Sequence, residues 1–387
     1  MRRILKWLGT LILFALVALC FAPTLIPPFL DRIYYQGPAS AHFDGARFFN
    51  PDGEDTFRVP GGRSRRGFIV SRLFGTDQRP PWPARVGVTQ SRPAPRVEGE
   101  KMVVTWIGHA GFLVQTNGLN ILTDPIWSDV AGPFGIGPTR VAAPGVRFED
   151  LPKIDLILVS HNHYDHMDLP TLKRLWDRDR PLIVTSLGND TVIAGGGARA
   201  RALDWGGRLA IRPGVEVVVT RGHHWGSRWF TDRNRALWSS FTVRLPGGNL
   251  FFAGDTGFGN GQWPREAAAK GSIRLALIPI GAFRFRPGEM GTGSHIGPYD
   301  AVRVFQRLGA SRAIGMHWGT FRLSYEAYRT PPRMLAALMR CAGYPAPSPF
   351  GIVAIGAPTE IPPYSAPSAL PQIARTCLDS DPIRALQ

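Results

Sequence analysis

The sequence has few cysteines. Only three occur among 387 residues, at positions Cys20, Cys341 and Cys377. This number excludes a disulfide-rich scaffold and a metal site built from cysteine thiolates. A bond between Cys341 and Cys377 would need an oxidising compartment, and the sequence offers no support for it.

Lysine is also scarce. Only five of the 45 basic residues are Lys, and 29 acidic residues leave a formal net charge of +16. A net positive charge of this size is typical of proteins that bind nucleic acid or an anionic membrane. However, the sequence has no long basic run and no nucleic-acid-binding motif, and a composition rich in Arg, Gly and Pro can follow from genomic base bias. We therefore expect no nucleic-acid partner.

The most informative segment of the chain is a cluster of metal-ligand types at 161–166. It reads His161-Asn162-His163-Tyr164-Asp165-His166, and imidazole and carboxylate together suit zinc. The apolar run 154–159 before it predicts a buried strand. The cluster therefore lies just past a strand end, where several side chains can face one ion. The alternative is a chance surface run of His and Asp.

Three further candidates follow other apolar runs. His224 comes after 215–219, Asp255 after 250–254, and His317 after 312–316. Together with the cluster they supply five His and two Asp, enough for two metal ions of four or five ligands once water is added. The predicted ligands are His161, His163, Asp165, His166, His224, Asp255 and His317.

These segments resemble the metallo-β-lactamase superfamily, and more closely its branch of N-acylphosphatidylethanolamine-hydrolysing phospholipases D and their bacterial relatives. The resemblance spans about residues 41 to 335. It implies an α/β fold, the αββα sandwich of two mixed sheets flanked by helices. The segments that carry it are 105–110, 122–126, 160–168, 224–225, 251–257 and 316–320.

The resemblance also implies a division of the ligands between two Zn²⁺ ions per chain, although other transition metals such as iron or manganese can replace zinc. His161, His163 and His224 would bind the first ion, and Asp165, His166 and His317 the second. Asp255 would bridge both. The choice of His224 over its neighbour His223 rests on Trp225, because the family carries His-Trp at this place. We expect His223 to be a pocket residue or a partner of a ligand.

The implied activity is that of a di-zinc hydrolase. Two zinc ions roughly 3.5–4 Å apart can share a water and generate hydroxide near neutral pH. Two aspartates and a hydroxide leave such a site at about +1, which favours an anionic phosphodiester. We expect a phosphodiesterase of phospholipase D type that acts on N-acylphosphatidylethanolamine-like lipids. A lactonase or other ester hydrolase is the alternative, followed by a nuclease, and a non-catalytic use of the fold stays open. Asp255, Asp165 and His295 are the candidate catalytic residues.

Other polar residues near these segments are expected to have supporting or structural roles. Asp124 is the expected hydrogen-bond partner of a ligating His, or else a turn residue before Pro125. Asp168 is expected at the N-cap of a helix that starts near 169. His109 is expected to be structural or part of a pocket wall. His295 resembles a family residue near the substrate phosphate, but the chain departs from the family around it, so a surface loop is the alternative.

The N-terminus predicts a membrane segment. Residues 7–30 carry no charge, and a bilayer span needs about 20 residues. Because basic residues precede this run, an uncleaved anchor would place the catalytic domain on the periplasmic side of a bacterial inner membrane. A cleaved signal that leaves a secreted or periplasmic protein is the alternative, and a peripheral apolar helix is a third. A membrane is then an expected partner, beside a phospholipid-like or other small-molecule substrate.

The remaining chain divides into an extension rich in Pro, Gly and Arg at 31–98, a hydrolase domain at 99–357 and a surface tail at 358–387, after the anchor or signal at 1–30. Apolar runs predict strands at 154–159, 181–185, 215–220, 238–244, 249–253 and 274–279. Helices are expected at 169–178, 298–308 and 331–341.

Overall fold

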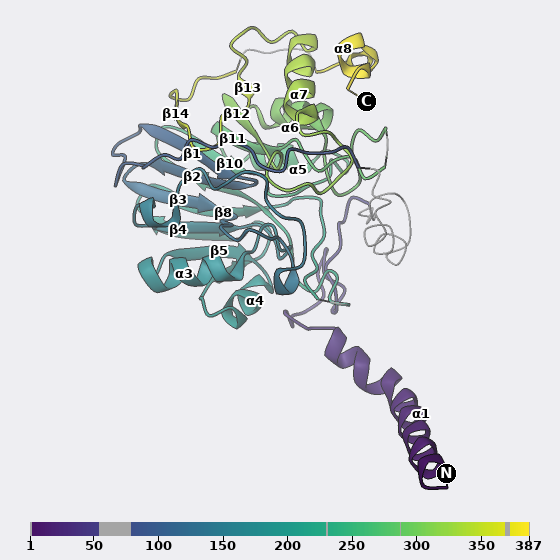
Figure 1. Cartoon of the computed structure of the whole chain (residues 1–387). Helices are drawn as coiled ribbons and strands as arrows, with labels where there is room; N and C mark the ends of the chain where they lie inside the picture. The colour runs from purple at the N-terminus through teal and green to yellow at the C-terminus, as the bar shows by residue number, and fades with distance from the viewer. Residues whose placement is uncertain (1, 54–78, 230, 287, 368–371, 387) are drawn as a thin grey trace.

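Two mixed β-sheets face each other in the computed structural model, which describes residues 2–53, 79–229, 231–286, 288–367 and 372–386 (Figure 1). The strand order is β14-β1-β2-β3-β4-β5-β6 in the first sheet and β13-β12-β11-β10-β9-β8-β7 in the second. The first sheet consists of β1 Met102–Gly108, β2 Gly111–Thr116, β3 Leu119–Thr123, β4 Leu156–Val159, β5 Leu182–Ser186, β6 Arg201–Leu203 and β14 Pro358–Ile361. The second consists of β7 Arg208–Arg212, β8 Val215–Thr220, β9 Ser240–Arg244, β10 Asn249–Phe252, β11 Ile273–Pro279, β12 Arg312–Met316 and β13 Phe350–Gly351.

Helices cover both outer faces of this pair of sheets (Figure 1). The first sheet is covered by α3 Leu169–Asp179 and α4 Asn189–Gly195, and the second by α5 Trp263–Ala268, α6 Pro298–Leu308 and α7 Thr330–Cys341. The predicted αββα sandwich is therefore confirmed. Asp168 is the N-cap residue of α3, as predicted, but its side chain makes no cap bond. It accepts hydrogen bonds from Ser128 and Thr171 instead.

Successive side chains of a strand in the first sheet contribute alternately to two separate hydrophobic cores. Val114 and Leu158 face the second sheet in the central core, whereas their neighbours Leu113 and Ile157 face α3 and α4 in a separate core. Because successive side chains point to opposite faces of a strand, a strand buried on both faces reads as a continuous apolar run. The apolar runs recognised in the sequence are strands of this kind.

The direction of the strands decides where the site lies. In the second sheet β8 and β10 are both antiparallel to β9, and β10 is parallel to β11 and β12. The carboxyl ends of β8, β10 and β12 therefore meet at one edge. Loops that follow these strands, and the loop after β4 of the first sheet, begin at this edge.

The first helix, α1 Arg2–Leu30, projects away from the sheets and exposes large apolar side chains (Figure 1). Within the described residues, no helix has both the length and the apolarity needed to cross a membrane. The predictions of a transmembrane helix and of a single N-terminal inner-membrane anchor are therefore wrong. They rested on the length of the uncharged run at 7–30 and on the basic residues before it.

A disulfide joins Cys341, at the end of α7, to Cys377. It ties the C-terminal segment to the helical layer, where Ile373 and Ile383 are buried. β14, which starts at Pro358, pairs with β1 and thereby adds a strand to the first sheet.

Arg274 in β11 links the two sheets. Its side chain is almost fully buried and donates hydrogen bonds to the carbonyl oxygens of Glu100, Ile361 and Pro362. We expect Arg274→Met to leave these acceptors unpaired and to lower the free energy of unfolding in urea by about 2–4 kcal/mol. The control is Arg244→Met, which removes an exposed pair with Glu216 and should cost less than about 1 kcal/mol. Equal effects of the two changes would contradict a bridging role for Arg274.

Candidate metal centre

The structure brings all seven predicted ligands together where β4, β8, β10 and β12 end. They form two groups, in each of which one nitrogen or oxygen atom per residue lies within 4.8 Å of the others. The first group is His161, His163, His224 and Asp255, and the second is His109, Asp165, His166 and His317. These groups can hold metal ions, and they contain the residues that the resemblance assigned to each ion, with His109 in addition. Asp255 also groups with His295 and His317, and Asp124 with His161 and His166.

The nitrogen atoms that face each other within the groups fit metal coordination. His161 Nε2 lies 2.8 Å from His163 Nδ1, which lies 3.4 Å from His224 Nε2. In the second group His166 Nε2 lies 3.1 Å from His317 Nε2. Ligand atoms about 2.0–2.1 Å from a tetrahedral zinc are separated by about 3.3 Å. A cation bound between these nitrogen atoms would therefore have ligands at suitable distances.

Asp255 is placed between the two groups. Its Oδ2 atom lies 3.1 Å from His166 Nε2 and 3.9 Å from His224 Nε2, and its Oδ1 atom lies 3.1 Å from His317 Nε2. The Oδ1 atom is buried, and its contact with His317 does not have the geometry of a normal hydrogen bond. A buried carboxylate oxygen without a well-oriented donor is costly, and a metal ion would remove this cost.

The opposite ring nitrogens are held by acceptors that fix the rings. Asp124 Oδ2 lies 2.7 Å from His166 Nδ1, and the same carboxylate accepts the backbone N–H of Ser160. The partner role predicted for Asp124 is thus present as a contact. The carbonyl oxygen of Ser294 lies 2.8 Å from His224 Nδ1. These contacts leave the other nitrogen of each ring free to bind a metal ion.

Burial and charge shift the pKa values of the cluster in two directions. Burial lowers the pKa of His163 and of His295 to about 3. Burial also disfavours the charged form of His317, but the carboxylates of Asp255 and Asp165 outweigh it and raise the pKa to about 9. Burial opposes the charged form of Asp255 as well, yet nearby imidazoles hold its pKa well below the usual range. Most of the imidazoles are therefore neutral at pH 7, the form that binds metal.

These shifts predict a pH optimum for the stability of the metal-free protein. Imidazoles with lowered pKa values bind protons more readily when unfolded, so stability falls as the pH drops from about 6.5 toward 3. The pKa of His317 is raised, so this residue affects stability in the opposite direction. Its stabilising effect is fully present below about pH 6.5 and is lost as the pH rises through about 9. We expect thermal melts of the metal-free protein to peak near pH 6.5.

Zinc should change this profile, because metal ions compete with protons for the same nitrogens. The melting temperature gained on adding zinc is expected to be larger at pH 9 than at pH 6. A metal-free protein whose melting temperature keeps rising up to pH 9 would contradict the charge assigned to His317.

His109 lies in the second group, whereas the sequence predicted a structural role or a place in a pocket wall for it. It is buried, and its Nε2 atom lies 2.8 Å from Asp165 Oδ2. Its backbone has a positive φ of 54° between β1 and β2, and its carbonyl accepts the N–H of His317. The sequence signals that could have pointed to it are its place in the tight turn after Gly108 and in the segment 105–110, which carries part of the family resemblance.

Residues of the extension also reach the centre, and the sequence did not predict them. Asn50 donates a hydrogen bond to the carbonyl oxygen of His224, and Asp52 lies 2.9 Å from His223 Nδ1. His223 is buried but belongs to neither group, which agrees with the choice of His224. The segment before the hydrolase domain therefore supports the His224 loop.

His295 lies within the centre and not on a surface loop. Its Nδ1 atom is 3.8 Å from Asp255 Oδ2, and its ring centroid is 5.0 Å from that of His224. The ring of Phe285 covers it at 5.1 Å. With 13% of its side chain exposed, against 16% for Asp165, it is one of the members that a substrate can reach.

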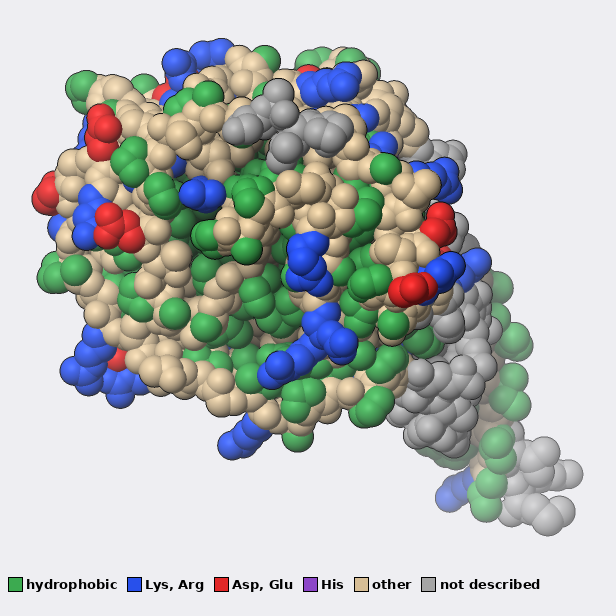
Figure 2. Space-filling view, turned by 90° about the horizontal axis from the view of Figure 1, so that it is seen from above, with side chains coloured by type: hydrophobic (Ala, Val, Ile, Leu, Met, Phe, Trp, Pro, Cys, Tyr) green, Lys and Arg blue, Asp and Glu red, His purple; other side chains and the backbone are tan. Residues whose placement is uncertain are grey.

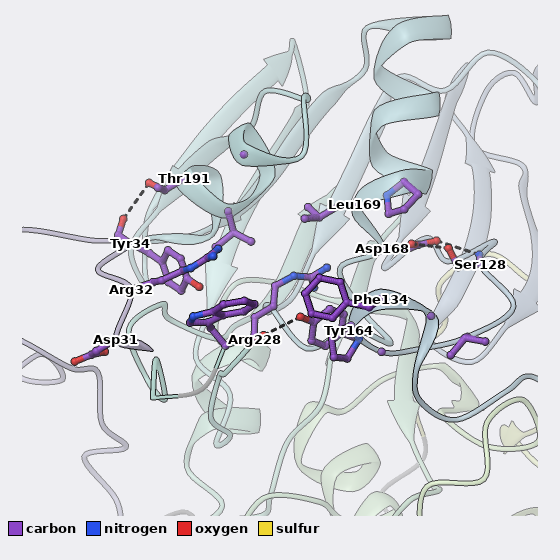
Figure 3. A pocket seen from close by; sticks show the side chains of 18 of the residues that line it. Asp31, Arg32, Tyr34, Ser128, Phe134, Tyr164, Asp168, Leu169, Thr191 and Arg228 are labelled. Atoms are coloured by element: carbon purple, nitrogen blue, oxygen red, sulfur yellow. Dashed lines mark hydrogen bonds between the residues drawn. The ribbon is translucent and has the colours of Figure 1, made fainter. Parts of the chain in front are cut away.

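A large pocket adjoins the loop that carries the cluster (Figure 3). Its volume is about 1200 Å³, and Tyr164 and Asp168 line it from this loop. Arg228 enters from the segment after His224, donates to the backbone of residues 162 and 167, and lies 4.0 Å from the Tyr164 ring. Apolar and aromatic side chains, among them Phe134 and Leu169, form much of the remaining wall.

The comparison with protein families identifies this arrangement. The model of the beta-lactamase superfamily domain matches residues 119–318, more than half of the chain. The protein belongs to the metallo-β-lactamase superfamily. It is 33% identical over 243 residues to N-acyl-phosphatidylethanolamine-hydrolyzing phospholipase D 1 of Caenorhabditis elegans, covering 60% of this chain and 68% of that protein. The predicted phospholipase D-like branch of this superfamily is thereby confirmed, and the fold is that of a metal-dependent hydrolase.

Other relatives support the same placement. The mitochondrial N-acyl-phosphatidylethanolamine-hydrolyzing phospholipase D of Saccharomyces cerevisiae is 35% identical over 256 residues. The match covers 64% of this chain and 54% of the yeast protein. An isothiocyanate hydrolase from Delia radicum gut bacteria has a TM-score of 0.53 at 19% identity, over 67% of this chain and 99% of that one. A metallo hydrolase of Ignicoccus hospitalis has a TM-score of 0.51 at 18% identity, over 68% and 99%. These two structures show the common fold alone.

Proposed function

We propose that this protein is a di-zinc phosphodiesterase of phospholipase D type that acts on N-acylphosphatidylethanolamine-like lipids. The observation that carries the proposal is the position of Asp255 between two adjoining groups of imidazoles and carboxylates. A single carboxylate that faces both groups suits two cations that share a bridging ligand. Relatives at 33% and 35% identity carry phospholipase D names.

In this proposal His161, His163 and His224 hold the first ion, Asp165, His166 and His317 hold the second, and Asp255 contacts both. Two bound zinc ions would supply a hydroxide nucleophile from water and would stabilise negative charge on phosphoryl oxygens. Zinc is proposed because imidazole and carboxylate ligands in compact groups suit it, and another transition metal would use the same residues.

The chain's own residues position the substrate around these ions. His295 is partly exposed and within 4 Å of Asp255, so we assign it to the substrate phosphate or to the leaving group. Asp165 orients the second group, since its Oδ2 atom lies 3.4 Å from both His166 Nε2 and His317 Nε2. Phe285 over His295 limits the access of water to this side.

The neighbouring pocket suits the rest of an amphiphilic substrate. Tyr164 lines the pocket, and the next residue, Asp165, belongs to the second group, although no member of the two groups lines the pocket itself. Apolar walls accommodate acyl chains, and charges of both signs line the pocket, from Arg32 and Arg228 and from Asp31, Asp129 and Asp168 (Figure 3). A pocket of this size and apolar character favours the acyl chains of a lipid over a small ester.

The deciding experiment is hydrolysis in ¹⁸O-labelled water by the full chain loaded with zinc. Label in the phosphatidic acid formed from N-acylphosphatidylethanolamine is the expected result, because it places the attack at phosphorus. Label in a released carboxylate would show acyl-ester or lactone chemistry and overturn the phosphodiesterase assignment. A parallel panel of phosphodiester, lactone and RNA substrates, with the Asp255→Ala protein as the blank, distinguishes a nuclease, whose binding should weaken steeply with salt.

A further inference from the structure

A second cavity lies away from the metal centre. It has a volume of about 950 Å³ and lies among α7, residues 352–358 and the segment 86–91 of the extension. Its lining includes no member of the two metal-ligand groups. This volume is within the range of about 300–1,000 Å³ that small-molecule sites occupy.

The lining of this cavity is mostly apolar, and its charged side chains are all positive. Aliphatic and aromatic side chains form most of the lining, and the lining contains no carboxylate. Its apolar members include Val86, Val88, Trp106, Trp318, Ile352 and Ile355. The charged residues that line it are Arg329 and Arg333, at the start of α7. An apolar ligand with an anionic group is the complement of such a surface.

The two arginines are available to a ligand. Both are exposed, and within the described residues neither guanidinium has an acidic partner. Arg96 and Arg235, by contrast, pair with Asp155 and Asp31. Figure 2 shows the face that carries α7 and β13, where hydrophobic side chains gather with Lys and Arg side chains among them.

A smaller cavity of about 180 Å³ prolongs the first one along α7. The two share Pro332, Ala336 and Ile352, and the smaller one is also lined by Met339 and Phe350. With a rise of 1.5 Å per residue, the helix from position 329 to 339 measures about 15 Å. The cavities therefore form an elongated, largely apolar groove, with Arg329 and Arg333 at one end and the single Arg340 at the other.

We propose that this groove binds an anionic amphiphile with a single chain. The carboxylate or phosphate group contacts Arg329 and Arg333, and the chain lies along α7 toward Met339. Trp318, which directly follows His317, lines the groove and packs against Trp106 at 5.3 Å. The bound chain therefore lies next to the loop of the second metal-ligand group, in a site separate from the proposed catalytic one.

Isothermal titration of the full, zinc-loaded chain tests the proposal with three probes of equal chain length, used below their micelle concentrations. Dodecanoate stands for a free fatty acid and dodecyl phosphate for a phospholipid head group, and 1:1 binding of one or both supports the site. Dodecyltrimethylammonium should not bind. Equal binding of the cation, or no binding of the two anions, would overturn the proposal.

Amino-acid substitutions test whether the anion binds at Arg329 and Arg333. Arg329→Gln with Arg333→Gln should weaken anion binding about tenfold, since each exposed charge pair contributes at most about 1 kcal/mol. The matched control changes Arg199 and Arg201 to Gln, which removes the same charge near β6 at the opposite edge of the first sheet. Ala336→Trp should fill the groove and abolish binding, with thermal melts to check its fold. Equal affinities of the control pair and the groove pair would overturn the site.

Removal of zinc separates this groove from the metal centre. Dodecanoate should bind equally well to the metal-free protein, because no metal ligand lines the groove. Loss of binding with the metal would place the anion at the catalytic centre and would contradict the proposal. This result does not depend on whether the centre hydrolyses a phosphodiester, so the two proposals fail separately.

Discussion

Replacing Asp255 by Ala is expected to remove most of the bound metal and to reduce kcat/KM by well over 100-fold. The reason is its position, because the carboxylate faces both groups and lies within 3.1 Å of His166 and His317. Without it, two buried sets of imidazoles lose the charge that compensates two divalent ions. Elemental analysis of the purified variant should find far fewer than two transition-metal ions per chain.

Asp124→Asn is the matched control for this change. Asp124 contacts the outer nitrogen of His166 and not the face that meets the metal. Loss of such a partner typically costs about 10–100-fold in metal affinity or activity. We therefore expect the Asp124→Asn protein to keep part of its metal when zinc is in excess. An Asp255→Ala protein that retains two ions and activity would contradict the bridging position.

Replacing His295 by Asn is expected to lower kcat by about 10²–10⁴-fold, the range for loss of a group that transfers or positions a proton. His295 is among the most accessible residues of the centre, and its Nδ1 atom lies 3.8 Å from Asp255 Oδ2. Because its role is proposed for the substrate, the metal content should stay near that of the unchanged protein. Kinetics and elemental analysis of the same preparation measure both quantities.

His42→Asn provides the comparison for His295. His42 is paired with Asp204 and belongs to neither metal-ligand group, so its loss should leave kcat within a few-fold. If the His295→Asn protein instead loses metal, His295 is a ligand in the group with Asp255 and His317. If it keeps full activity, the assignment to the substrate is wrong.

The elements that carry the ligands were predictable, because local patterns specify them. The strand expected at 215–220 and the helix expected at 298–308 are found with the same bounds. The strand expected at 154–159 begins two residues later, at Leu156. These segments are buried on both faces or on one helical face, so their apolar spacing reports their structure directly. The short edge strand β6 shows no such spacing, because its residues are only partly buried or exposed.

The tertiary structure decided the features that depend on distant contacts. His109 meets Asp165 across 56 positions, Asn50 reaches His224 across 174, and Cys341 joins Cys377. Nothing in the spacing of the chain reports such pairs, since they form only when β1 and β4 share a sheet and the extension folds back over the edge. The sequence by itself determined the ligand types and the strands that present them. The family resemblance added their division between two ions, and their approach to one another, with Asp255 between the groups, depends on the way in which the two sheets align the ends of β4, β8, β10 and β12.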